Sequence, residues 1–211
     1  MAELALVLYG LYLALAFGLR TVLQWRSTGS SGFHGVGGQP GSAEWLAGVG
    51  FVVALVMGAA APALALAGVL EPIEAVDGAA ARAAGVALAV SGISLTLYAQ
   101  VAMGKSWRIG VDQEERTELV TDGPFALVRN PIFSAMIPTA FGLALMVPSV
   151  LAIGGFVALV IALELQVRVV EEPYLIRAQG QRYIDYATVT GRFVPGLGRL
   201  EVTGSDGPVG G

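Results

Sequence analysis

Long apolar stretches constrain this chain more than any other feature of its sequence. Five of them lie at about 4–23, 45–70, 80–103, 131–147 and 149–170. A helix needs about 20 mostly apolar residues to cross a bilayer. Only 13% of the 211 residues are charged, whereas soluble domains carry about 25%. We therefore predict an all-α, polytopic membrane protein with about five transmembrane helices and a short C-terminal cytosolic helical segment. This segment, Arg177 to Tyr186, is expected to be a short helix interrupted near Gly180.

Composition also excludes several kinds of site. The chain has no cysteine, so disulfides and thiolate ligands are ruled out. Its single histidine, His34, argues against a histidine-based metal site, and we predict no metal. The net charge of -4, with no basic stripe, argues against a nucleic-acid partner.

Positive charges gather at one set of helix ends. Arg20 and Arg26 follow the first stretch, four more Lys or Arg residues separate the third from the fourth, and five Arg residues end or follow the fifth. The turn at Pro148 carries no charge. The positive-inside rule then predicts a protein of the cytoplasmic (inner) membrane, with its N-terminus outside and its C-terminus and candidate site in the cytosol.

The chain is predicted to form a single membrane domain, 1–211. Residues 1–104 would form three N-terminal transmembrane helices, and 105–200 would hold the functional region. The glycine-rich composition of 201–211 predicts a disordered tail.

A charged helix face ends the fifth stretch. Glu164, Arg168 and Glu171 are spaced four and three residues apart, and Arg168 can also reach Glu172 at i+4. One alternative is that these side chains only extend to the membrane interface. Charges at this depth are costly and usually functional, so we favour a polar site built from the group.

A Gly-Pro-Phe-Ala-Leu-Val-Arg-Asn-Pro sequence leads into the fourth stretch. We call these residues, 123–131, the box. Pro131 suits the first position of a helix and Asn130 is a good N-cap. The free N–H groups of a helix start bind carboxylates and other anions. The alternative is a plain capped helix with Arg129 at the lipid headgroups.

Together these motifs resemble a known family. The box is followed by a hydrophobic hairpin, then by Glu171-Glu172, Tyr183, Arg192 and Pro195. This order and spacing resemble the isoprenylcysteine carboxyl methyltransferases and their relatives, the membrane phospholipid N-methyltransferases. The resemblance covers about the last hundred residues, and many members have His at the position of Asn130.

The resemblance implies an integral membrane methyltransferase that uses S-adenosylmethionine. The cofactor would lie between the last two membrane helices and the C-terminal segment, and the acceptor would enter from the bilayer. By this resemblance, the expected cofactor-binding residues are Gly123, Pro124, Leu127, Val128, Arg129, Asn130, Pro131, Glu172 and Tyr183.

Arg168, Glu171, Glu172 and Arg192 are the candidate catalytic residues. Methyl transfer from a sulfonium mainly requires positioning and exclusion of water. For a carboxylate acceptor, Arg168 or Arg192 would orient the substrate; for an amine, a glutamate would take its proton.

Carboxyl O-methylation of a lipophilic molecule is the leading prediction. The partners would be a lipophilic or lipidated substrate and membrane lipid, and the oligomeric state is left open. The alternatives are N-methylation of an amine lipid headgroup and a small non-enzymatic transporter or structural protein. A transporter is disfavoured because the chain shows no paired interrupted helices in two related halves.

Overall fold

The structure is a computed structural model that describes residues 1–31, 35–107 and 119–201. Four helical runs within these residues are long and apolar enough to cross a membrane: Ala2–Thr28, Ala43–Leu66, Ala79–Met103 and Val150–Gln179. A fifth apolar helix, α5 (Pro131–Met146), is shorter. The predicted all-α, polytopic membrane fold is confirmed. His34 and the predicted disordered tail lie outside the described residues.

Two of the spans contain a π-helical segment. The first span consists of α1 (Ala2–Leu13), a π segment (Ala14–Leu19) and α2 (Arg20–Thr28). The last consists of α6 (Val150–Leu165), a π segment (Gln166–Glu171) and α7 (Glu172–Gln179). The sequence placed the end of the last stretch near residue 170, but the helical run continues to Gln179. A π segment bonds i to i+5, so it rotates every later side chain relative to an α-helix.

Helix starts agree with local sequence signals. The side chain of Ser42 accepts a hydrogen bond from the Trp45 N–H (3.2 Å) and caps α3 (Ala43–Leu66). Ser149 caps α6 in the same way, and Pro131 occupies the first position of α5. These devices satisfy or remove backbone donors that a helix start leaves open.

Small residues bring α4 (Ala79–Met103) close to α5. A Cβ added at Gly85 would lie 2.6 Å from the carbonyl oxygen of Gly142, and one added at Gly142 would lie 2.6 Å from the Ala89 nitrogen. Backbones can approach this closely only where a side chain is missing, which is common between membrane helices. The α4–α5 pair and the α3–α6 pair form the two most extensive helix contacts.

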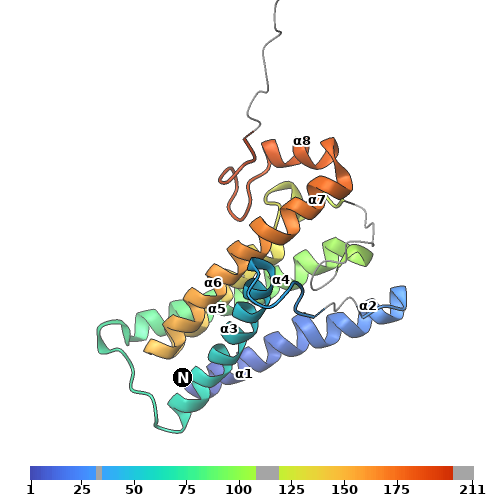
Figure 1. Cartoon of the computed structure of the whole chain (residues 1–211). Coiled ribbons are helices and arrows are strands. Elements are labelled where there is room, and N and C mark those ends of the chain that lie inside the picture. Colours follow the sequence, from blue (N-terminus) through green and yellow to red (C-terminus); the bar gives the residue numbers. More distant parts are fainter. Residues whose placement is uncertain (32–34, 108–118, 202–211) are drawn as a thin grey trace, which may run out of the picture.

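The bundle has two distinct ends (Figure 1). The N-terminus lies at one end, where the Ile73 N–H donates to the carbonyl oxygen of Pro148 in the α5–α6 turn (2.8 Å). Helices α7 and α8 (Gln181–Val189) lie at the other end. The predicted interruption near Gly180 is confirmed, since Gly180 separates the two with φ of 56° and ψ of -133°, a combination that is essentially restricted to glycine. The sidedness in the membrane stays a prediction.

Candidate active site

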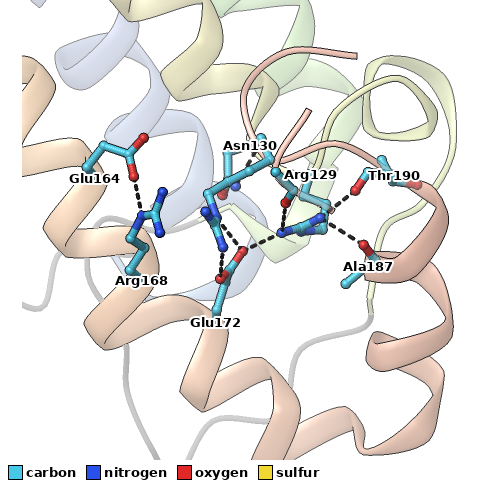
Figure 2. Close-up of polar contacts among 9 residues, drawn as sticks. Arg129, Asn130, Glu164, Arg168, Glu172, Ala187 and Thr190 are labelled. Atoms are coloured by element: carbon cyan, nitrogen blue, oxygen red, sulfur yellow. Dashed lines mark hydrogen bonds and ion pairs between the residues drawn. The ribbon is translucent and has the colours of Figure 1, made fainter. Parts of the chain in front are cut away.

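Glu172 forms the centre of an ion cluster. Its Oε1 accepts hydrogen bonds from Arg129 Nη2 (2.6 Å) and Arg192 Nε (2.8 Å), and its Oε2 accepts one from Arg192 Nη2 (2.8 Å). Glu172 begins α7, Arg129 belongs to the box, and Arg192 follows α8. Figure 2 shows Glu172 beside Arg129. One carboxylate therefore joins three segments that are distant in sequence, and charge-assisted bonds of this kind are strong.

Arg129 ties the box to the C-terminal segment. Its side chain is 1% exposed. Besides Glu172, it donates to the carbonyl oxygens of Ala187 (3.0 Å), Thr190 and Gly198 (3.1 Å). Its Nε is also buried and has no hydrogen-bond partner among the described residues. The guanidinium thus holds the turns around residues 187–198 in place and keeps one N–H uncommitted.

Backbone bonds reinforce this docking. The Arg129 N–H donates to Gly191 O (2.8 Å) and the Asn130 N–H donates to Arg192 O (3.1 Å). Val128 and Gly191 form a parallel β-bridge. The Asn130 side chain also donates to Arg192 O (3.2 Å), and within the described contacts it does not cap α5. Asn130 occupies the predicted N-cap position of α5, but its side-chain amide binds the C-terminal segment instead of capping the helix.

Arg168 does not join the cluster. It pairs with Glu164 (Nε to Oε2, 2.5 Å), and the two side chains are 58% and 39% exposed. Figure 2 shows this pair apart from Glu172 and Arg129. The predicted i,i+4 neighbour, Glu172, binds Arg129 and Arg192 instead.

A cavity of about 440 Å³ adjoins the cluster. From the predicted set, Arg129, Asn130, Pro131, Glu171 and Tyr183 line it. Further walls come from α1, α3 and α4, which are membrane spans. The cavity therefore connects the charged end of the bundle with its apolar interior.

Seven of the predicted residues are not part of the described lining of this cavity. Within the described part of the chain, its lining does not include Gly123, Pro124, Leu127, Val128, Arg168, Glu172 or Arg192. Gly123 and Pro124 start a 3-10 turn (Gly123–Ala126), and Leu127 is 63% exposed. Glu172 and Arg192 consequently act on the cavity through Arg129, as positioning residues.

Two tyrosines of α8, Tyr183 and Tyr186, line the cavity. Burial, followed by the negative charge of Glu172, raises the pKa of Tyr183 to about 12. Burial likewise raises the pKa of Tyr186 above its usual range, and the Tyr186 hydroxyl donates to Phe125 O (2.6 Å). The hydrogen bonds to Glu172 raise the pKa of Arg192. At neutral pH the site thus contains neutral phenols and permanently charged guanidinium groups.

The polar residues that line the cavity but were not predicted from the sequence include Tyr12, Thr96 and Gln100. They lie inside apolar spans, on α1 and α4. The available signal was their polarity at membrane depth, where polar side chains usually face a bundle interior or a cavity.

One known family model matches part of the chain. The model of the phospholipid methyltransferase family matches residues 80–182. Over these residues the chain is similar to this family of integral membrane methyltransferases. The matched range includes α4 to α7 and hence Arg129 and Glu172, while Arg192 and the first two spans lie outside it. No curated protein and no solved structure matches the chain.

The match indicates a membrane methyltransferase, a class of enzyme for which S-adenosylmethionine is the general methyl donor. The residues assigned to cofactor binding and catalysis stay predictions, as does the acceptor.

Proposed function

We propose that the protein transfers a methyl group from S-adenosylmethionine to a lipophilic acceptor that reaches the cavity from the bilayer. One observation carries the proposal. A single cavity is lined both by the box residues Arg129 to Pro131 with Glu171 and by apolar side chains of the membrane spans. A polar donor and a lipophilic acceptor require such a mixed chamber.

The groups around the cavity fit this cofactor. Its volume falls in the range of about 300–1,000 Å³ that is usual for small-molecule sites. Ile132 and Phe133, at the start of α5, line the cavity, and first-turn N–H groups have no acceptor within their helix, which suits the carboxylate of the methionine part. The carboxylate of Glu171 suits its ammonium group or ribose hydroxyls. When bound, the cofactor would supply an electrophilic methyl group on a sulfonium.

The ion cluster supports this chamber from behind. Glu172 neutralises Arg129, which in turn holds the 187–198 segment against the box. Buried Tyr183 and partly buried Tyr186 close the same side. The chain thereby orients its reactants and keeps water out, which is the main contribution that a methyl transfer needs from an enzyme.

The lining favours an amine as acceptor. Glu171 is the carboxylate that the described lining contains. With one of its oxygens on the cofactor, the other can take the proton that an ammonium must lose before it attacks. The two arginines predicted to orient a carboxylate, Arg168 and Arg192, are paired with Glu164 and Glu172 instead. N-methylation is therefore the version that we place first.

Carboxyl O-methylation is the second candidate, and one observation favours it. Arg129 lines the cavity, and its Nε has no partner among the described residues. A guanidinium N–H is a strong donor to a carboxylate. In this version Arg129 takes the orienting role that the sequence assigned to Arg168 or Arg192.

Cofactor binding is testable by isothermal titration of the protein in lipid nanodiscs with S-adenosylmethionine and its demethylated product. We expect binding that weakens at least tenfold in Glu171→Gln and in Asn130→Ala. Glu164→Gln is the matched control, because Glu164 pairs with Arg168 at an exposed position. Absence of affinity for both ligands in the unmodified protein would overturn the proposal.

The acceptor class is testable with methyl-labelled cofactor and native membranes. Base treatment of the labelled lipid fraction releases methanol from a methyl ester but not from a methylamine. Label that stays bound supports the amine acceptor, and label released as methanol supports the carboxylate acceptor. Label that never enters the lipid fraction would refute both.

A further inference from the structure

Three polar side chains are buried at the membrane-span wall of the cavity. Tyr12 on α1 is 4% exposed, and Thr96 and Gln100 on α4 are 0% and 3% exposed. All three line the cavity. Tyr12 Oη, Thr96 Oγ1 and Gln100 Oε1 are buried, and none has a hydrogen-bond partner among the described residues.

Such a group needs an explanation beyond packing. A buried polar atom without a partner destabilises the folded protein, and nearly all such atoms in native structures are bonded. Three of them from two spans face one cavity. Residues that weaken the fold in this way are typical of binding sites, where a ligand satisfies them.

The orientation of Gln100 defines what the ligand must offer. Its Nε2 donates to the carbonyl oxygen of Ala16 (2.8 Å), which belongs to the π segment of the first span. This bond fixes the amide, so Oε1 is left as an acceptor that requires a donor. The hydroxyls of Tyr12 and Thr96 are close enough to interact with each other, but their geometry falls outside the limits of a normal hydrogen bond. Each can still donate or accept.

The lack of charged side chains among the described residues of this wall restricts the kind of ligand group that can bind there. The cavity residues contributed by α1, α3 and α4, as far as the structure describes them, include no ionisable group other than the phenol of Tyr12. A phosphate or carboxylate offers acceptors only, so it cannot satisfy Gln100 Oε1, and its charge would be unpaired at membrane depth. A hydroxyl or an amide is neutral and carries both a donor and an acceptor.

We propose that Tyr12, Thr96 and Gln100 form a recognition subsite for a neutral hydroxyl or amide group on a lipophilic ligand. That this ligand is the methyl acceptor rests on the proposed function; the subsite itself does not. The polar group would lie at the wall formed by α1 and α4, and the apolar part of the ligand would contact the surrounding span residues.

The test uses the full chain in nanodiscs and tritiated dodecanamide as the probe, measured by scintillation proximity. Competitors are 1-dodecanol, which can donate and accept, and 1-methoxydodecane, which can only accept. We expect the alcohol to compete at least tenfold better than the ether. Thr96→Val and Tyr12→Phe should each weaken probe binding about two- to tenfold, the range expected for one hydrogen bond.

Tyr9→Phe is the matched control on the same helix. The Tyr9 hydroxyl donates to Leu55 O (2.6 Å). Tyr9 lines a smaller, adjoining cavity that shares Tyr12 and Leu55 with the larger one, but Tyr9 itself does not line the larger cavity. This variant should lose thermal stability and keep probe binding. Tyr12→Phe and Thr96→Val should show the reverse, with an unchanged or higher unfolding temperature, because their hydroxyls have no bond to lose.

Two results would overturn the subsite: equal competition by alcohol and ether, or unchanged probe binding in both variants. Tyr12, Thr96 and Gln100 would then bind only water. Binding of the demethylated cofactor is measured on the same preparations. If the unmodified protein does not bind the demethylated cofactor, the methyltransferase proposal is refuted and the subsite still stands. The two failures are therefore distinguishable.

Discussion

Glu172→Gln perturbs the ion cluster with almost no change in side-chain shape. In the structure Glu172 accepts three hydrogen bonds from Arg129 and Arg192, at 2.6, 2.8 and 2.8 Å. A glutamine retains one carbonyl oxygen, but its NH₂ group would face a guanidinium donor. Arg129, with a side chain 1% exposed, would lose the negative charge that neutralises it and would carry an unpaired buried charge.

The size of the effect follows from burial. Removing one partner of a buried ion pair costs about 3–5 kcal/mol. The Arg192 side chain is 13% exposed and can regain water more easily, so we expect the lower end, about 3 kcal/mol. The contacts at risk are those between the box and residues 187–198. With a factor of ten per 1.4 kcal/mol, local opening of this docking should become roughly a hundredfold more frequent.

Hydrogen exchange measured by mass spectrometry is the direct assay. The Arg129 and Asn130 amides donate to the carbonyls of Gly191 and Arg192, so they report on this opening. The control is Glu164→Gln, which removes an exposed pair worth at most about 0.5 kcal/mol. Equal exchange of the Arg129 and Asn130 amides in the two variants would refute the structural role given to Glu172.

Three further results are expected. Gly85→Ala should destabilise the bundle by about 1–3 kcal/mol in thermal unfolding, because its Cβ would lie 2.6 Å from Gly142 O; Gly10→Ala, with open space around it, should be neutral. Gly180→Ala should cost about 1–3 kcal/mol and loosen α8 in limited proteolysis, given its φ of 56°. The raised pKa of Tyr183, about 12, means that the unfolded chain loses this proton first, so stability should fall from about pH 10 upward, and less steeply in Tyr183→Phe.

Local patterns predicted the scaffold well. Apolar length indicated the spans, Pro131 indicated the start of α5, and Gly180 indicated the break before α8. Each of these depends on neighbours within a few residues, for which helix geometry gives firm rules. The box and the double glutamate were also placed at the same end of the bundle correctly.

Pairing within the site could not be predicted in the same way. Glu172 binds Arg129 and Arg192, which are 43 and 20 residues away, whereas helical spacing can identify only partners three or four residues apart. The π segment at Gln166–Glu171 adds a second difficulty. It bonds i to i+5 and so shifts the later residues relative to an α-helix, and no residue pattern in that stretch signalled it.

The cavity is lined by residues inside the range that the family model matches and by residues outside it. The residues outside it can determine which lipophilic molecule binds. Glu172 and the box lie within residues 80–182, which the family model matches. Tyr12 lies outside that range, yet its hydroxyl faces the same cavity as Thr96 and Gln100. The first span therefore contributes a wall to a site whose charged end is built by the last two. A substitution at Tyr12 can change which lipophilic molecule binds without altering Arg129 or Glu172, because the two ends of the cavity share no hydrogen bond in the described residues.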